Sequence, residues 1–175
     1  LTKMSHLHFA STESYGKRIV QLGEAPWRVT VSGAPSLDNL ASIQLLSKEE
    51  MEQKYGLNLS EPCILFTFHP VTNSDEETPE KFCAVLDALD ETSMPVVFTQ
   101  PNADAKGSVI ASMINAYLLT HPEATMVENF GVQGYFSMMS HAAAMVGNSS
   151  SGLIEAPSFG LPVVNIGSRQ GGRTR

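Results

Sequence analysis

The segment Cys63-Ile64-Leu65-Phe66-Thr67-Phe68 decides the fold class of this chain. It is apolar at all but one position, so it lacks the alternation of a strand with one solvated face and is typical of a strand buried on both faces. A segment with an apolar stripe at helical spacing follows at 79–89, and a second short apolar run follows at 95–99. This order of strand, helix and strand predicts a parallel sheet covered by helices.

The same alternation extends in both directions from this segment. We expect strands at 5–9, 28–32, 63–68, 95–99, 125–128, 145–147 and 162–166. We expect helices at 11–22, 79–89, 108–119, 135–144 and 152–158. The sequence therefore predicts an α/β protein with a Rossmann-like, doubly wound parallel sheet.

A break in this rhythm at residues 41–60 indicates a joint between domains, and we expect a linker there with helical character at 48–54. Residues 1–40 contain too few elements to fold alone, so they are expected to be the tail of an incomplete N-terminal Rossmann-like domain. Residues 61–175 would form the C-terminal domain. The chain begins at Leu1 in dense, patterned sequence, which indicates a fragment or a processed chain.

Composition narrows the class of protein. The net charge of −7 argues against nucleic-acid binding, which needs a surplus of Lys and Arg. No apolar run approaches the roughly 20 residues that a membrane helix needs, so no membrane contact is expected. Cys63 and Cys83 lie in apolar runs without metal-type spacing, which favours free thiols in a cytoplasmic protein. His6 and His8 could share one strand face, but no third ligand at a sensible spacing accompanies them, so we expect no metal site.

Polar, Gly-rich or Pro-rich segments follow the predicted strands. In an open parallel sheet, ligands bind beyond the carboxyl ends of the strands, which places a candidate site in these segments. They are residues 33–36, 69–72, 100–102, 129–131, 148–151 and 167–173.

The strongest of these segments is Asn148-Ser149-Ser150-Ser151-Gly152, between a strand and a helix. Backbone N–H groups at a helix start, with hydroxyls beside them, form a phosphate site. The alternative is that the serines cap the helix, but none of them has Glu or Gln three residues later, and capping explains only one serine. Glu155 lies four residues after Ser151, where it could accept hydrogen bonds from ribose hydroxyls or simply be a surface residue.

Two further strand ends carry candidate ligand contacts. Arg169, in the Gly-rich segment 167–173, has a guanidinium group that suits a diphosphate, although a solvated loop would look the same. His69 ends a strand and precedes a proline, where it could bind a phosphate oxygen, carry a proton or have a structural role.

Five segments together resemble the hydrolysing UDP-N-acetylglucosamine 2-epimerases of sialic-acid-type sugar biosynthesis, and the resemblance covers essentially the whole chain. They are Lys3-Met4-Ser5-His6-Leu7-His8-Phe9, Gly33-Ala34-Pro35-Ser36-Leu37-Asp38, His69-Pro70-Val71-Thr72, the run from Gly147 to Gly160, and Asn165-Ile166-Gly167-Ser168-Arg169-Gln170. The non-hydrolysing 2-epimerases have His-Arg-Arg-Glu-Asn where this chain has His69-Pro70-Val71-Thr72-Asn73, which favours the hydrolysing branch.

The resemblance implies the glycosyltransferase-B architecture, with this chain as its second half and UDP held mainly by the C-terminal domain. It implies no cofactor and no metal, a UDP-sugar as substrate, and a homo-oligomer for the full-length protein. By position, the residues implied to contact UDP are His69, Asn102, Ser149, Ser150, Glu155 and Arg169, with Phe130 near the uracil. His69 is the one residue expected to act in catalysis, by neutralising the departing diphosphate.

The implied reaction converts UDP-N-acetylglucosamine and water into N-acetylmannosamine and UDP, by elimination of UDP and hydration of the glycal. The family's acidic catalytic residues lie upstream of Leu1, so we expect this piece alone to be inactive. One alternative is the same chemistry on a UDP-diacetamido-trideoxyhexose of the legionaminic-acid route. Another is a non-catalytic nucleotide-binding or glycosyltransferase-B module. The joint presence of His69-Pro70-Val71-Thr72 and Ser168-Arg169-Gln170 argues against that module.

Overall fold

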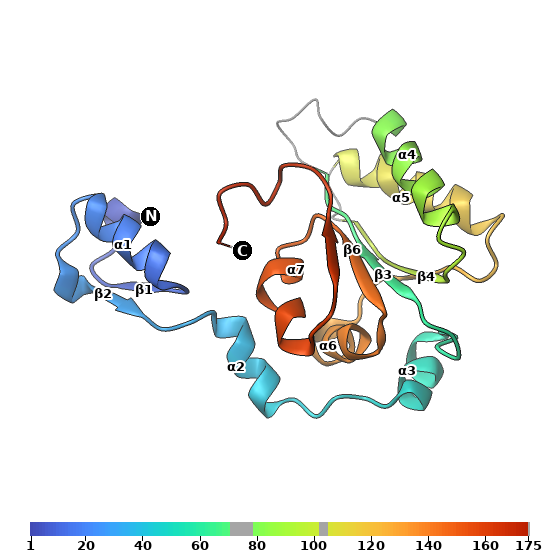
Figure 1. The fold of residues 1–175 in the computed structure, drawn as a ribbon, viewed down its shortest axis with the longest axis horizontal. Helices are drawn as coiled ribbons and strands as arrows, with labels where there is room; N and C mark the ends of the chain where they lie inside the picture. Colours follow the sequence, from blue (N-terminus) through green and yellow to red (C-terminus); the bar gives the residue numbers. More distant parts are fainter. Residues whose placement is uncertain (71–78, 102–104, 175) are drawn as a thin grey trace. The chain divides into compact units, whose positions relative to one another are not determined.

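A computed structural model of the chain describes residues 1–70, 79–101 and 105–174. The chain divides into two compact units: unit 1 contains Leu1–Ile43 with the last two residues, and unit 2 contains Gln44–Arg173. Each unit has its own sheet, and all strand pairs are parallel (Figure 1). The predicted α/β class with parallel sheets is therefore confirmed.

Unit 1 is a strand–helix–strand motif followed by a helix. Its strands are β1 (His8–Ala10) and β2 (Val29–Val31), its helices are α1 (Glu13–Gln21) and α2 (Pro35–Ser42), and two 3-10 turns cover Thr2–Met4 and Pro26–Arg28. Gly16 brings α1 close to β2, because a Cβ there would lie 3.1 Å from the Val31 side chain. β1 directs His8 and Ala10 inward, whereas Phe9 is 70% exposed.

Unit 2 contains a five-stranded sheet in the order β5-β4-β3-β6-β7. Its strands are β3 (Ile64–Thr67), β4 (Val96–Thr99), β5 (Thr125–Val127), β6 (Ala144–Gly147) and β7 (Val163–Asn165). Its helices are α3 (Lys48–Tyr55), α4 (Pro79–Asp90), α5 (Ala105–Leu118), α6 (Gly131–His141) and α7 (Ser151–Ile154), with a 3-10 turn at Ala156–Phe159. Counted within the unit, the strand order is 3-2-1-4-5, which is the Rossmann order.

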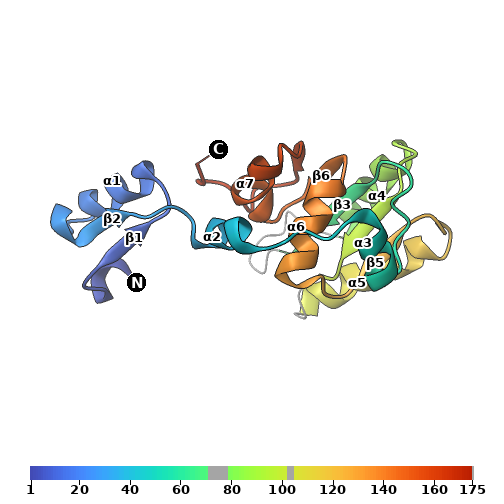
Figure 2. The same ribbon diagram turned by 90° about the horizontal axis from the view of Figure 1, so that it is seen from below.

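The sheet is the middle of three layers (Figure 2). Ile64, Phe66 and Phe68 pack in one buried cluster with side chains of α4 and α5. On the other side, α3 packs on α6, and Met51 of α3 is completely buried. Burial on both faces explains why the strands are apolar without alternation.

The boundaries of several elements differ from those expected. α6 begins at Gly131, four residues before the predicted start, and Gly134 in its first turn lies so close to the Tyr55 hydroxyl that a Cβ there would be 2.1 Å from it. The predicted linker, 41–60, contains α3 and the buried residues Leu57 and Leu59, and residues 44–60 belong to unit 2. A capping box at Ser47 and Glu50 and a left-handed Gly56 give α3 defined ends. None of the helices in the described ranges has the length and apolar character that a membrane crossing requires.

Candidate functional site

The carboxyl ends of β3 and β6 are joined by the side chain of Asn148. Its amide nitrogen donates to the His69 carbonyl oxygen at 2.7 Å, and its amide oxygen accepts from the His69 backbone nitrogen at 2.8 Å. The Asn148 side chain is completely buried. β3 and β6 are the central pair at which the strand order reverses, and ligands of open α/β sheets bind at this position. The segments after these two strands are therefore held together at the expected ligand site.

Gly147 allows this close approach. Its φ is +144°, and a Cβ would lie 1.9 Å from the Thr67 carbonyl oxygen. The Asn148 backbone nitrogen donates to that same oxygen at 3.0 Å. No other residue type fits here without moving one strand end away from the other.

The segment after β7 reaches the same point through two donors. Arg169 Nη1 donates to the Asn148 carbonyl oxygen at 3.0 Å, and Gln170 Nε2 donates to it at 2.7 Å. Gln170 is buried, whereas Arg169 is exposed. The exposed guanidinium has further N–H groups for a ligand, because it carries five N–H donors.

The three serines after β6 have different roles. α7 is a single turn, so its macrodipole contributes little to anion binding. Ser149 Oγ accepts from Ser151 Oγ at 2.8 Å and from the Ser151 backbone nitrogen at 3.3 Å. Ser150 precedes the helix, but its side chain makes no capping hydrogen bond. Capping thus accounts for one serine, as expected from the sequence, and the Ser150 hydroxyl stays available to a ligand.

Tyr135 of α6 lies beneath these serines. Its Oη is 2.8 Å from Ser151 Oγ and 3.2 Å from Thr67 Oγ1. Burial raises the pKa of Tyr135, and the Glu155 carboxylate raises it further, while the hydrogen bonds between Tyr135 and Ser151, Thr67 and Ser149 oppose this shift. The hydroxyl therefore keeps its proton at neutral pH.

Phe130 and Glu155 both lie near Tyr135. Phe130 is 6% exposed, and its ring centroid is 4.9 Å from that of Tyr55 and 6.4 Å from that of Tyr135. The Tyr55 hydroxyl donates to the Phe130 carbonyl oxygen at 2.7 Å, which holds the segment after β5. Glu155 follows α7 and is half-buried.

The structure therefore gathers the predicted site residues that it describes into two groups. His69, Ser149, Ser150 and Arg169 surround or directly follow Asn148, and Phe130 and Glu155 border Tyr135. Asn102 lies outside the described residues, as do Val71 and Thr72. Sequence reasoning placed Asn148 and Gln170 within candidate segments but assigned neither of them a role, although a polar residue directly after a buried strand was a signal for Asn148. It had no signal for Tyr135, which lies inside a helix.

The histidine pair near the N-terminus does not share a strand face. His6 precedes β1 and its ring contacts Trp27 edge-on at 5.9 Å, whereas His8 Nε2 lies 3.5 Å from Glu24. The described ranges contain no group of three metal-ligating side chains.

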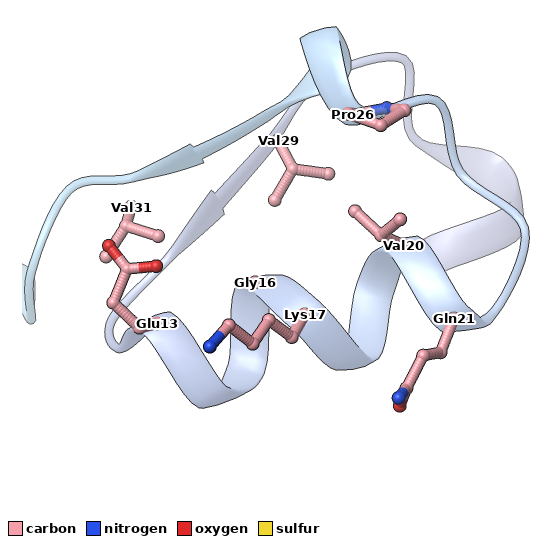
Figure 3. Close-up of a pocket in the computed structure, with 8 residues that line it drawn as sticks. All are labelled: Glu13, Gly16, Lys17, Val20, Gln21, Pro26, Val29 and Val31. Atoms are coloured by element: carbon pink, nitrogen blue, oxygen red, sulfur yellow. The ribbon is translucent and has the colours of Figure 1, made fainter.

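Each unit also contains a hollow lined by other residues. One, of about 440 Å³, is in unit 1, where Val20 of α1 faces Val29 of β2 and Glu13 and Lys17 lie at the rim (Figure 3). The other, of about 360 Å³, is lined by residues before β4 and β5, including Pro95 and Glu123. It is at the amino edge of the sheet, where the fold does not place ligands. Neither hollow includes a predicted site residue.

Comparison with known proteins relates the chain to epimerases. The family model described as UDP-N-acetylglucosamine 2-epimerase matches residues 1–175. The GDP/UDP-N,N'-diacetylbacillosamine 2-epimerase (hydrolyzing) of Campylobacter jejuni is 38% identical over all of this chain and 46% of its own length. The UDP-N-acetylglucosamine 2-epimerase of Neisseria meningitidis is 32% identical over 99% of this chain and 45% of its own length. The chain thus spans less than half of these relatives.

A solved structure agrees on the fold. The Neisseria meningitidis UDP-GlcNAc 2-epimerase bound to UDP-GlcNAc superposes with a TM-score of 0.73 at 21% identity, covering 94% of this chain and 45% of that one. The match of the family model over the whole chain, together with these relatives, shows that the chain belongs to the UDP-N-acetylglucosamine 2-epimerase family.

Proposed function

We propose that this chain is the UDP-holding half of a hydrolysing UDP-N-acetylglucosamine 2-epimerase. The observation that carries the proposal is the meeting of His69, Ser149 and Arg169 around Asn148 in a chain of this family. In the reaction, C2 loses its proton, the C1–O bond to UDP breaks, and a glycal forms. Water then adds its hydroxyl to C1 and a proton to C2 with inverted configuration, giving N-acetylmannosamine and UDP.

The residues of the site contact different parts of the nucleotide. Arg169 and the hydroxyls of Ser149 and Ser150 donate to the diphosphate, because charge-assisted and hydroxyl donors suit its oxygens. Glu155 accepts from the ribose hydroxyls, and Phe130 borders the uracil. His69 stabilises the charge that develops on the diphosphate as the C1–O bond breaks, and this is its catalytic role.

We also propose that the chain is inactive by itself. It spans 46% of the Campylobacter jejuni relative, and the groups that remove and return the C2 proton are assigned to the remainder of a longer protein. UDP release from UDP-N-acetylglucosamine by the purified chain should stay at the uncatalysed rate. Release at an enzyme-like rate would reject this part of the proposal.

A second substrate is favoured by the identities of the relatives. The Campylobacter jejuni and Legionella pneumophila diacetylbacillosamine 2-epimerases are 38% and 33% identical to the chain, against 32% for the Neisseria meningitidis UDP-N-acetylglucosamine 2-epimerase. The same elimination on a UDP-diacetamido-trideoxyhexose is therefore the second candidate. The longer protein that carries this chain can be assayed for UDP release from each of the two sugar nucleotides. The faster release identifies the substrate.

Nucleotide binding tests the proposal directly. The chain should bind UDP more tightly than CMP in calorimetric titrations, and UDP more tightly than 2′-deoxy-UDP. Glu155→Ala should weaken UDP binding by roughly 10-fold to 100-fold, the effect of losing one or two hydrogen bonds to a charged group, and should abolish the preference over 2′-deoxy-UDP.

The matched control is Glu123→Ala, an exposed carboxylate at the amino edge of the sheet, which should leave UDP binding unchanged. Equal affinity of the wild-type chain for UDP and CMP, or an unaltered preference for UDP over 2′-deoxy-UDP in Glu155→Ala, contradicts the proposal.

A further inference from the structure

Five hydroxyl groups form a continuous row under the site. Thr99 Oγ1 donates to Thr67 Oγ1 at 3.2 Å, and Thr67 Oγ1 is 3.2 Å from Tyr135 Oη. Tyr135 Oη is 2.8 Å from Ser151 Oγ, which donates to Ser149 Oγ at 2.8 Å. The row runs from the end of β4, through β3 and α6, to the segment after β6.

The direction of the row follows from counting protons. A hydroxyl has one proton to donate and two lone pairs with which to accept. Ser151 donates its proton to Ser149, so the hydrogen bond between Tyr135 and Ser151 must be donated by Tyr135. Tyr135 must then accept from Thr67, which in turn accepts from Thr99. The protons of Thr67, Tyr135 and Ser151 therefore point toward Ser149, whereas the Thr99 proton is shared between Thr67 Oγ1 and the Phe66 carbonyl oxygen, 3.4 Å away.

Ser149 is where this row ends. Its oxygen accepts from both the Ser151 hydroxyl and the Ser151 backbone nitrogen, so both of its lone pairs are used. Ser149 can then take part in only one further hydrogen bond, as a donor. Tyr135 Oη lies near Ser149 and competes for its proton, because Tyr135 accepts from Thr67 with only one of its two lone pairs. A charged phosphate oxygen is the stronger acceptor of the two. The side chain is thus prepared for an anionic oxygen, and not for a cation or for a ligand N–H group.

We propose that Tyr135 is a positioning residue that fixes the direction of this row, so that Ser149 offers its proton to a phosphate oxygen of the nucleotide. This inference rests on the proposed binding of UDP beside Ser149, and it adds a residue that does not itself touch the ligand. Hydrogen bonds in a directed row polarise one another, which makes Ser149 a stronger donor than an isolated serine. The row also holds Ser149 in place before the ligand arrives, and this reduces the entropy lost on binding.

A double-mutant cycle tests the role of Tyr135. Tyr135→Phe keeps the ring and removes the hydroxyl, and Ser149→Ala removes the donor. In calorimetric titrations of the whole chain, each variant should weaken UDP binding about tenfold, which corresponds to about 1.4 kcal/mol. The double variant should be no weaker than Ser149→Ala alone, because the row acts only through Ser149.

Uridine provides the second readout, since it lacks the phosphates. Its affinity, measured by NMR, should be the same for the wild type and Tyr135→Phe, whereas a general disturbance of the site would weaken both ligands. Tyr117→Phe is the matched control, because Tyr117 lies at the carboxyl end of α5 and away from the row. Ser151→Ala interrupts the row by a smaller change and should weaken UDP binding as Tyr135→Phe does. It serves as the test if Tyr135→Phe folds poorly.

The outcomes separate this inference from the proposed function. Absence of UDP binding by the wild-type chain rejects both. Normal UDP binding combined with additive effects in the double variant rejects only the positioning role of Tyr135. Equal weakening of uridine and UDP in Tyr135→Phe and Ser151→Ala also rejects it.

Discussion

The Asn148 side chain and the His69 backbone exchange two hydrogen bonds, of 2.7 and 2.8 Å, in the same pattern that two backbone peptides form between strands. This pair extends the contact between β3 and β6 beyond Gly147, where the regular strand pairing ends. It also lies at the one edge of the sheet where His69, Ser149 and Arg169 come together. Asn148 therefore links these segments with both of its parts: its side-chain amide holds His69, and its backbone carbonyl oxygen accepts from Arg169.

Replacement of Asn148 by alanine should destabilise the protein. Asn148→Ala removes two hydrogen bonds and leaves the His69 N–H and C=O groups without this partner, so the free energy of unfolding should fall by about 2–4 kcal/mol. Urea unfolding followed by circular dichroism measures this change. Asn115→Ala, an exposed change on α5, should stay within about 0.5 kcal/mol of the wild type. Similar unfolding free energies for both variants would show that the pair contributes nothing.

Gly147 and Gly160 both have positive φ angles, but they differ in their surroundings. A Cβ at Gly147 would lie 1.9 Å from the Thr67 carbonyl oxygen, whereas a Cβ at Gly160 would meet no atom within 4 Å. Gly147→Ala should therefore lower the free energy of unfolding by about 3 kcal/mol or more, and Gly160→Ala by about 1–2 kcal/mol. Thermal unfolding of both variants measures these losses. A larger loss of stability in Gly160→Ala than in Gly147→Ala would contradict the prediction.

Truncation tests where the C-terminal domain begins. Residues 44–173 form one compact unit, whereas a chain that starts at residue 61 lacks Met51, Leu57 and Leu59, all of which are buried. Losing these side chains removes about 5–8 kcal/mol of burial free energy, which is comparable to the whole stability of a domain. The 44–173 chain should therefore unfold cooperatively, and the 61–173 chain should not. Equal cooperativity would place the domain boundary at residue 61.

Two tyrosines should make the stability depend on alkaline pH. Burial raises the pKa of both Tyr117 and Tyr135 above the usual value of 10. Because the unfolded chain loses these protons first, the stabilising contribution is complete below pH 10 and declines as pH rises toward the folded-state pKa. Urea unfolding across this range should show a smaller decline for Tyr135→Phe and Tyr117→Phe than for the wild type. The same slope in all three proteins would contradict the raised pKa values.

The sequence alone determined the class of the fold and which segments lie at the edge of the sheet that carries the candidate site. Near-continuous apolar runs such as 63–68 require burial on both faces, and polar segments after such runs must lie at the carboxyl edge of a parallel sheet. His69, Ser149 and Arg169 could therefore be assigned to one edge of the sheet, because each follows a predicted strand and parallel strands end at the same edge. The close contact between Gly134 of α6 and the Tyr55 hydroxyl could not be predicted, because Tyr55 belongs to another helix.

Only the tertiary structure decided how these residues are held. Asn148, Tyr135 and Gln170 act through partners 16 to 79 residues away, and a linear pattern carries no signal for a hydrogen bond between distant segments. The same holds for residues 44–60, whose polar composition predicts a linker but which bury Met51, Leu57 and Leu59 in unit 2. Local sequence determines which backbone conformations and faces are favoured, whereas buried polar partners are chosen by the packing of strands and helices that meet only in the folded chain.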